Sequence, residues 1–171
     1  MTTVDRRAPT FVAVLLIGLG LIFLITNLLG IDFGRVWPLI FFVIGAGFYL
    51  PVGLLPQARA GLAALFVPGT VLHGLGLIFL YNTLTDDWNS WAYIWTLIPG
   101  FVGVGLMLAG WIGRWEGGTI RAGLWLALGS VAAFSLFASL FGGRVIGSLG
   151  PILLIALGGL LLLRSVRPSR A

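Results

Sequence analysis

The chain has 171 residues, of which 59% are hydrophobic and only 9% are charged, whereas soluble domains carry about 25% charged residues. This composition excludes a packed water-soluble domain, because so few charges cannot cover so much apolar surface, and it predicts lipid as the surrounding solvent. The net charge of +5 comes from arginine without any lysine, and the absence of cysteine excludes disulfides and cysteine-ligated metals.

Six apolar segments follow one another along the chain, each close to the roughly 20 residues that cross a bilayer. In chain order they cover 10–29, 36–55, 62–83, 91–112, 118–140 and 147–164. We expect all six to be helices, because an isolated segment in lipid must satisfy its backbone hydrogen bonds internally. Pro38 and Pro151 fall where the second and sixth helices should begin, a position that tolerates a missing N–H.

The heptapeptide GLGLIFL occurs twice, at Gly18–Leu24 and at Gly74–Leu80. Aligning the segments on it predicts three tandem helical hairpins, 10–55, 62–112 and 118–164, within one membrane domain that covers 1–171. Glycines recur in columns of this alignment, and small residues at such positions let membrane helices approach closely. The predicted helix-packing glycines are Gly18, Gly45, Gly47, Gly74, Gly103, Gly105, Gly123 and Gly158.

The arginines predict the orientation of the chain. Eight of the ten lie in the tails and in the connections that share a side with the N-terminus, and only Arg35 and Arg144 lie on the other side. The positive-inside rule then places both termini in the cytoplasm and leaves no role in nucleic-acid binding. Amphipathic indole rings favour the headgroup level, so we expect the following residues at the membrane interface: Trp37, Trp88, Trp91 and Trp95.

His73 is the only histidine and lies inside the third segment. Ionisable residues within a membrane are candidates for function, and His73 can ligate a haem iron or a pigment, or pass a proton. The alternative is a neutral imidazole that donates one hydrogen bond to a carbonyl of a neighbouring helix. The repeat counterparts Ile17 and Ala122 are apolar, so the helical scaffold does not need a histidine here.

Catalytic and ion-coupled chemistry is disfavoured by the placement of the acids. None of the five Asp and Glu residues lies within a predicted span, although proton relays and ion-coupled transport use partnered acids in the membrane. Ser130, Ser135 and Ser139 lie on or near one face of the fifth segment, and no acid is near them in sequence. We expect their hydroxyls to bond to the preceding turn or to a neighbouring helix, and we expect no enzyme activity, cofactor or metal site.

The stretch GLGLIFLITNLLGIDFGRVWPLI, at Gly18–Ile40, resembles the transmembrane hairpin of bacterial LiaI/LiaF-type proteins. In that family a Gly-rich helix ends in Asn, a Gly-Ile turn follows, and Trp-Pro-Leu opens the return helix. The resemblance implies an integral protein of the bacterial plasma membrane with a link to the cell-envelope stress response. The sequence ends at Ala171 without the soluble domain of LiaF-type relatives, so kinase control through such a domain is not expected.

These patterns favour an all-α membrane protein with six transmembrane helices in three hairpin repeats, both ends in the cytoplasm, acting as a non-enzymatic scaffold. Its partners would be the lipid bilayer and either other membrane proteins or further copies of the chain, bound through Gly-rich helix faces. Two alternatives stay open at this point. One is a small-molecule or ion carrier with a pseudo-threefold interior, and the other is an accessory subunit of a membrane complex that binds a pigment or haem through His73.

Overall fold

The structure is a computed structural model that describes residues 7–166. Within this range every regular element is helical and no strand is formed, which confirms the predicted all-α class. The long helices are α1 (Arg7–Leu28), α3 (Leu39–Leu54), α5 (Phe66–Thr85), α7 (Ile98–Gly113), α8 (Gly117–Phe141) and α9 (Gly143–Val166). The short elements are α2 (Phe33–Val36), α4 (Arg59–Leu62), α6 (Trp91–Ile94) and the 3-10 turns η1 (Pro56–Ala58), η2 (Ala63–Leu65), η3 (Trp88–Ser90) and η4 (Trp95–Leu97).

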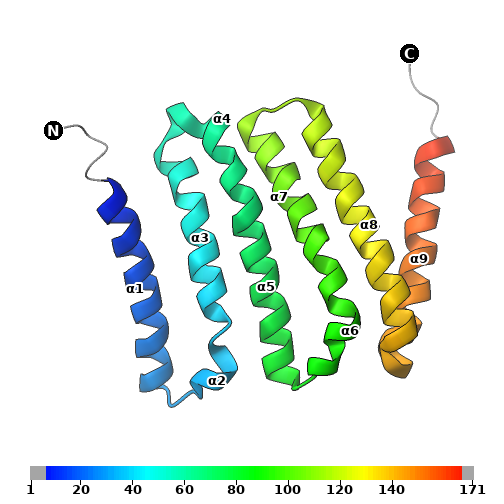
Figure 1. The fold of residues 1–171 in the computed structure, drawn as a ribbon, viewed down its shortest axis with the longest axis horizontal. Helices are drawn as coiled ribbons and strands as arrows, with labels where there is room; N and C mark the ends of the chain where they lie inside the picture. The colour runs from blue at the N-terminus through cyan, green and yellow to red at the C-terminus, as the bar shows by residue number, and fades with distance from the viewer. Residues whose placement is uncertain (1–6, 167–171) are drawn as a thin grey trace.

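The long helices lie side by side in chain order, and the chain reverses direction from each to the next (Figure 1). α1 packs on α3, α3 on α5, α5 on α7, α7 on α8, and α8 on α9. The helices α1 and α9 lie at opposite edges of this row, so each is packed extensively against a single neighbour. The arrangement is an open row, in contrast to a closed bundle with a central interior.

Three continuous helical runs within residues 7–166 are long and apolar enough to cross a membrane. They are Pro56–Thr85, Trp88–Gly113 and Gly117–Phe141, and they correspond to the third, fourth and fifth apolar segments of the sequence. The remaining apolar stretches in the described range are shorter, at Val12–Leu28, Leu39–Leu54 and Gly150–Leu163. By length and composition the structure therefore indicates a membrane protein.

The two prolines expected at helix starts have different positions in the structure. Pro38 is the N-cap of α3, as predicted, whereas Pro151 lies inside α9. The prediction for Pro151 is wrong because α9 begins at Gly143, directly after the turn residue Gly142. Gly143 has φ of +66°, a conformation that glycine adopts without steric cost, and it allows the chain to reverse with almost no loop.

The interior of the row holds both apolar and polar side chains. An apolar cluster is formed by Ile78, Tyr93, Ile94 and Ala138, and the fully buried side chains of largest volume are Asn82, Pro38, Ser90 and Ser135. Large hydrophobic residues are exposed on the outside, among them Leu16 (63% exposed) on α1 and Ile155 (75% exposed) on α9. An apolar exterior of this kind suits a chain whose solvent is hydrocarbon.

Candidate functional site

The contact between α7 and α8 brings the backbones of two predicted packing glycines together. A Cβ added to Gly103 would lie 2.5 Å from the carbonyl oxygen of Gly123, and a Cβ added to Gly123 would lie 2.5 Å from the carbonyl oxygen of Gly103. The backbone nitrogen of Ala127 is 2.8 Å from the first of these positions. Because backbone atoms cannot turn aside as a side chain can, this contact requires glycine on both helices.

The other predicted packing glycines are covered by neighbours, with one exception. The atoms nearest to a Cβ built at each position belong to an adjacent helix: Gly18 (Val43), Gly45 (His73), Gly74 (Phe101) and Gly105 (Thr70 and Val67). Gly47 is also buried. Gly158 is different, because no atom lies within 4 Å of its Cβ position, so the packing expected there is not formed within the described part of the chain.

His73 lies on α5 against α3, and its ring nitrogens have different environments. Nδ1 is 2.8 Å from the carbonyl oxygen of Gly69, one turn earlier on the same helix, so Nδ1 carries the proton and donates. Tyr49 stacks on the imidazole with ring centroids 5.3 Å apart, and Phe42 meets it edge-on at 5.4 Å. The expected bond to a neighbouring helix is thus replaced by a bond within α5, and in this tautomer Nε2 keeps a lone pair.

The four tryptophans predicted at the interface all lie at the end of the row that carries α2 and α6. Trp37 follows α2 and Trp91 begins α6, and both rings pack on Phe79, with centroids 5.1 Å and 5.7 Å away. Trp88 and Trp95 are 44% and 46% exposed. A hydrogen bond of 3.1 Å from the Thr83 hydroxyl to the Arg35 carbonyl ties α5 to α2 at this same end.

A buried polar network closes the turn from α5 to η3. Its centre is Asn82, whose amide orientation is assigned from its neighbours. The amide nitrogen donates to the Asp87 carbonyl (3.1 Å) and to the Ser90 hydroxyl (2.8 Å), and the amide oxygen accepts from the Trp91 indole (3.1 Å). Ser90 in turn donates to the Asp87 carbonyl at 2.7 Å. The sequence alone shows Asn82 near a helix end but gives no sign that Trp91 bonds to it.

The opposite end of the row carries exposed arginines and is called the basic end here, defined by Arg59, Arg114 and Arg121. The Trp115 indole N–H donates to the Ala60 carbonyl at 2.8 Å, which joins the α7–α8 turn to α4. None of these three arginines forms an ion pair with another residue of the described range, and Glu116 is the acid nearest to them in sequence. This end therefore has a net positive charge.

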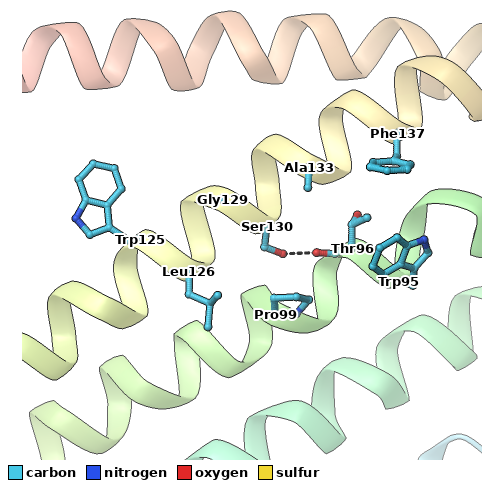
Figure 2. A pocket seen from close by; sticks show the side chains of 9 residues that line it. All are labelled: Trp95, Thr96, Pro99, Trp125, Leu126, Gly129, Ser130, Ala133 and Phe137. Atoms are coloured by element: carbon cyan, nitrogen blue, oxygen red, sulfur yellow. Dashed lines mark hydrogen bonds between the residues drawn. The ribbon is translucent and has the colours of Figure 1, made fainter.

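A groove of about 230 Å³ lies between α8 on one side and η4 with the start of α7 on the other (Figure 2). Its walls are formed by apolar and small side chains: Trp95, Thr96, Pro99, Trp125, Leu126, Gly129, Ser130, Ala133 and Phe137. The groove is open along one side, and Trp125, which is 65% exposed, lies at the end nearer the basic end. No pattern in the sequence pointed to this groove, because its walls come from two segments that are far apart in the chain.

The serines of α8 form the hydrogen bonds expected of them. Ser130 donates to the Thr96 carbonyl at 2.5 Å, from α8 across to η4 (Figure 2). Ser135 donates to the Val131 carbonyl at 2.8 Å, and Ser139 donates to the Ser135 carbonyl at 2.6 Å, each one turn back along α8. All three hydroxyls therefore donate to backbone carbonyls, one of η4 and two of α8.

No family model, curated protein or solved structure matches this chain. The resemblance to LiaI/LiaF-type hairpins therefore stays a prediction from the sequence.

Proposed function

We propose that the chain is a non-enzymatic scaffold of the bacterial plasma membrane, which crosses the bilayer six times as three hairpins and has both termini in the cytoplasm. It binds other membrane proteins, or further copies of itself, through apolar helix faces. The connections that carry arginine lie on the cytoplasmic side, and the resemblance to LiaI/LiaF-type proteins supports a link to the envelope stress response. The segregation of Arg59, Arg114 and Arg121 from Asp32 and Asp86 at opposite ends of the row supports this orientation.

The open row is the observation that carries the proposal. A carrier encloses its substrate between helices, but α1 and α9 lie at opposite edges and enclose no interior between them (Figure 1). Both edge helices present exposed large side chains, such as Leu16 and Ile155, to their surroundings. Helices in lipid associate by close packing and not by the hydrophobic effect, so faces of this kind stay available for a partner helix.

Site-directed photo-crosslinking in native membranes tests the scaffold. A photoreactive residue at Leu16 on α1 or at Ile155 on α9 should form covalent adducts with a protein, because both positions face outward from the edges of the row. The matched control is Ala109, which is fully buried in α7 and should form no intermolecular adduct. Adducts with lipid alone at both edge positions would contradict a scaffold. A reporter fused after residue 171 tests the orientation separately and should be active only in the cytoplasm.

A second candidate function is supported by one observation, the tautomer of His73. Histidines that ligate metals commonly donate their other ring N–H to a backbone carbonyl, and Nδ1 of His73 does so to Gly69. Nε2 is then free to ligate a haem or pigment held by a membrane complex. Absorption spectra of the purified chain, wild type and His73→Ala, test this candidate. A visible band lost in the variant supports it, and a colourless wild-type protein refutes it.

A further inference from the structure

The groove between α8 and η4–α7 lies on the same helix as part of the basic end. Arg121 lies on α8 one turn before Trp125, the wall residue nearest that end. Residues four apart on a helix lie on neighbouring parts of its surface, so the Arg121 guanidinium and the Trp125 end of the groove are close together. Positive charge and an open apolar channel thus follow one another along the helix.

The part of the groove nearer the basic end suits one extended hydrocarbon chain. From Arg121 to Gly129 the surface of α8 runs for about 12 Å along the helix axis, at 1.5 Å per residue. One leaflet of a bilayer whose hydrocarbon core is about 30 Å thick is about 15 Å deep, so a chain from the basic end reaches Gly129, whereas Phe137, about 24 Å from Arg121, lies with Trp95 toward the opposite interface. Gly129 forms part of the wall and has no atom within 4 Å of its Cβ position, so the channel is unobstructed at its middle.

The charged side chains at the end of the groove nearer the basic end are mostly positive. Arg121 and Arg114 are exposed and form no ion pair with another residue of the described range, and arginine binds phosphate through two parallel hydrogen bonds. Glu116 lies between them in sequence and weakens the positive field, but Arg59 is brought to the same end by the Trp115–Ala60 hydrogen bond. The balance of these four side chains is positive, which complements an anionic group.

We propose that this surface is a binding site for one anionic phospholipid. The phosphate of the lipid is bound by Arg121 and Arg114, and one acyl chain lies in the groove from Trp125 past Gly129. The inference rests on the membrane placement proposed above, but it requires no protein partner. The competing occupant of the groove is a transmembrane helix of another protein. Binding of such a helix would not depend on Arg114 and Arg121.

Native mass spectrometry of the purified full chain in detergent tests the site with two lipids of identical acyl chains, phosphatidylglycerol and phosphatidylcholine. We expect tighter binding of the first phosphatidylglycerol than of the first phosphatidylcholine. Each arginine near a membrane surface contributes about fivefold to the affinity for anionic lipid. The double variant Arg114→Gln with Arg121→Gln should therefore bind phosphatidylglycerol about 25-fold more weakly than the wild type. The control Arg35→Gln, at the other end of the row, should leave this preference unchanged, and Glu116→Gln should strengthen it.

The groove is tested with a matched pair of glycine variants. Gly129→Leu places a side chain in the groove and should lower the affinity for both lipids at least tenfold. Gly20→Leu on α1, where a Cβ also meets no atom within 4 Å, should leave both affinities unchanged. Far-UV circular dichroism and gel filtration check that each variant is folded, and Gly129→Val replaces Gly129→Leu if that variant aggregates. Equal affinity of the wild type for the two lipids would overturn the head-group site. Unchanged binding by Gly129→Leu, or protein adducts from a photoreactive residue at 129, would overturn the acyl-chain site.

These measurements use the isolated chain, so their outcome is independent of the scaffold. A lipid site without any protein adduct at Leu16 or Ile155 would refute only the scaffold, and protein adducts without lipid selectivity would refute only the lipid site.

Discussion

Replacing Gly103 by alanine tests the close backbone contact between α7 and α8. The added methyl would lie 2.5 Å from the carbonyl oxygen of Gly123 and 2.8 Å from the backbone nitrogen of Ala127, whereas ordinary van der Waals contact begins at 3.4 Å. Both obstructing atoms belong to the backbone of α8, so the two helices must move apart and lose contact along their length. Overpacking of this kind destabilises a protein by about 1–3 kcal/mol.

The matched control is Gly129→Ala on α8, where no atom lies within 4 Å of the added methyl. This change should leave stability unchanged or raise it by up to about 1 kcal/mol, because alanine is the better helix former. Unfolding in mixed micelles with increasing sodium dodecyl sulfate, followed by far-UV circular dichroism, measures both variants on one scale. If Gly103→Ala is as stable as Gly129→Ala, the backbone contact between α7 and α8 is not as the structure has it.

Three further substitutions test single hydrogen bonds by the same unfolding assay. Asn82→Leu should destabilise the chain by about 1–3 kcal/mol, because the Trp91 indole and the Asp87 carbonyl lose a buried hydrogen-bond partner. A loss of stability no larger than that of the exposed control Asn89→Leu would contradict the network. Ser130→Ala should lower the free energy of unfolding by about 0.6 kcal/mol, because the hydrogen bond to the Thr96 carbonyl is lost. The control Ser139→Ala removes a hydrogen bond within α8 and should lower it by less. The reverse order would show that the bond from α8 to η4 contributes nothing to stability. Trp115→Phe keeps an aromatic ring but removes the hydrogen bond to the Ala60 carbonyl, so it should lower the free energy of unfolding by about 0.5–1.5 kcal/mol. Equal hydrogen-exchange rates at Ala60–Ala64 in variant and wild type would refute the link between α4 and the α7–α8 turn.

The helical class and the position of most close contacts could be predicted from the sequence because both follow from local rules. Lipid requires that a segment satisfy its own hydrogen bonds, and glycine is favoured where backbones meet, as at Gly103 and Gly123. The start of α9 could not be predicted in this way. Proline at a helix start is a statistical preference, and it was outweighed by the turn at Gly142 and Gly143, which lets the helix begin eight residues before Pro151.

The groove and the Asn82 network were missed for a different reason. Both depend on which side chains meet across helices, and hydropathy reports only that a residue is apolar or polar. The sequence shows Asn82 only as a polar residue near the end of the third apolar segment, and the amphipathic indole of Trp91 predicts a place at the membrane interface. Trp91 does lie at the end of the row with the other predicted interfacial tryptophans, and its N–H points into the protein rather than toward the headgroups.

The predicted packing glycines make two kinds of contact along the row. Gly18 and Gly74 meet Val43 and Phe101, residues on the return helix of their own predicted hairpins, whereas Gly123 meets α7 of the preceding one. The small-residue face of α8 thus packs on α7. α9 is left to pack on α8 through Gly150, whose Cβ position is covered by Ser135 and Ser139. Within the described residues α9 therefore packs extensively on α8 alone, and Gly158 stays open on its surface.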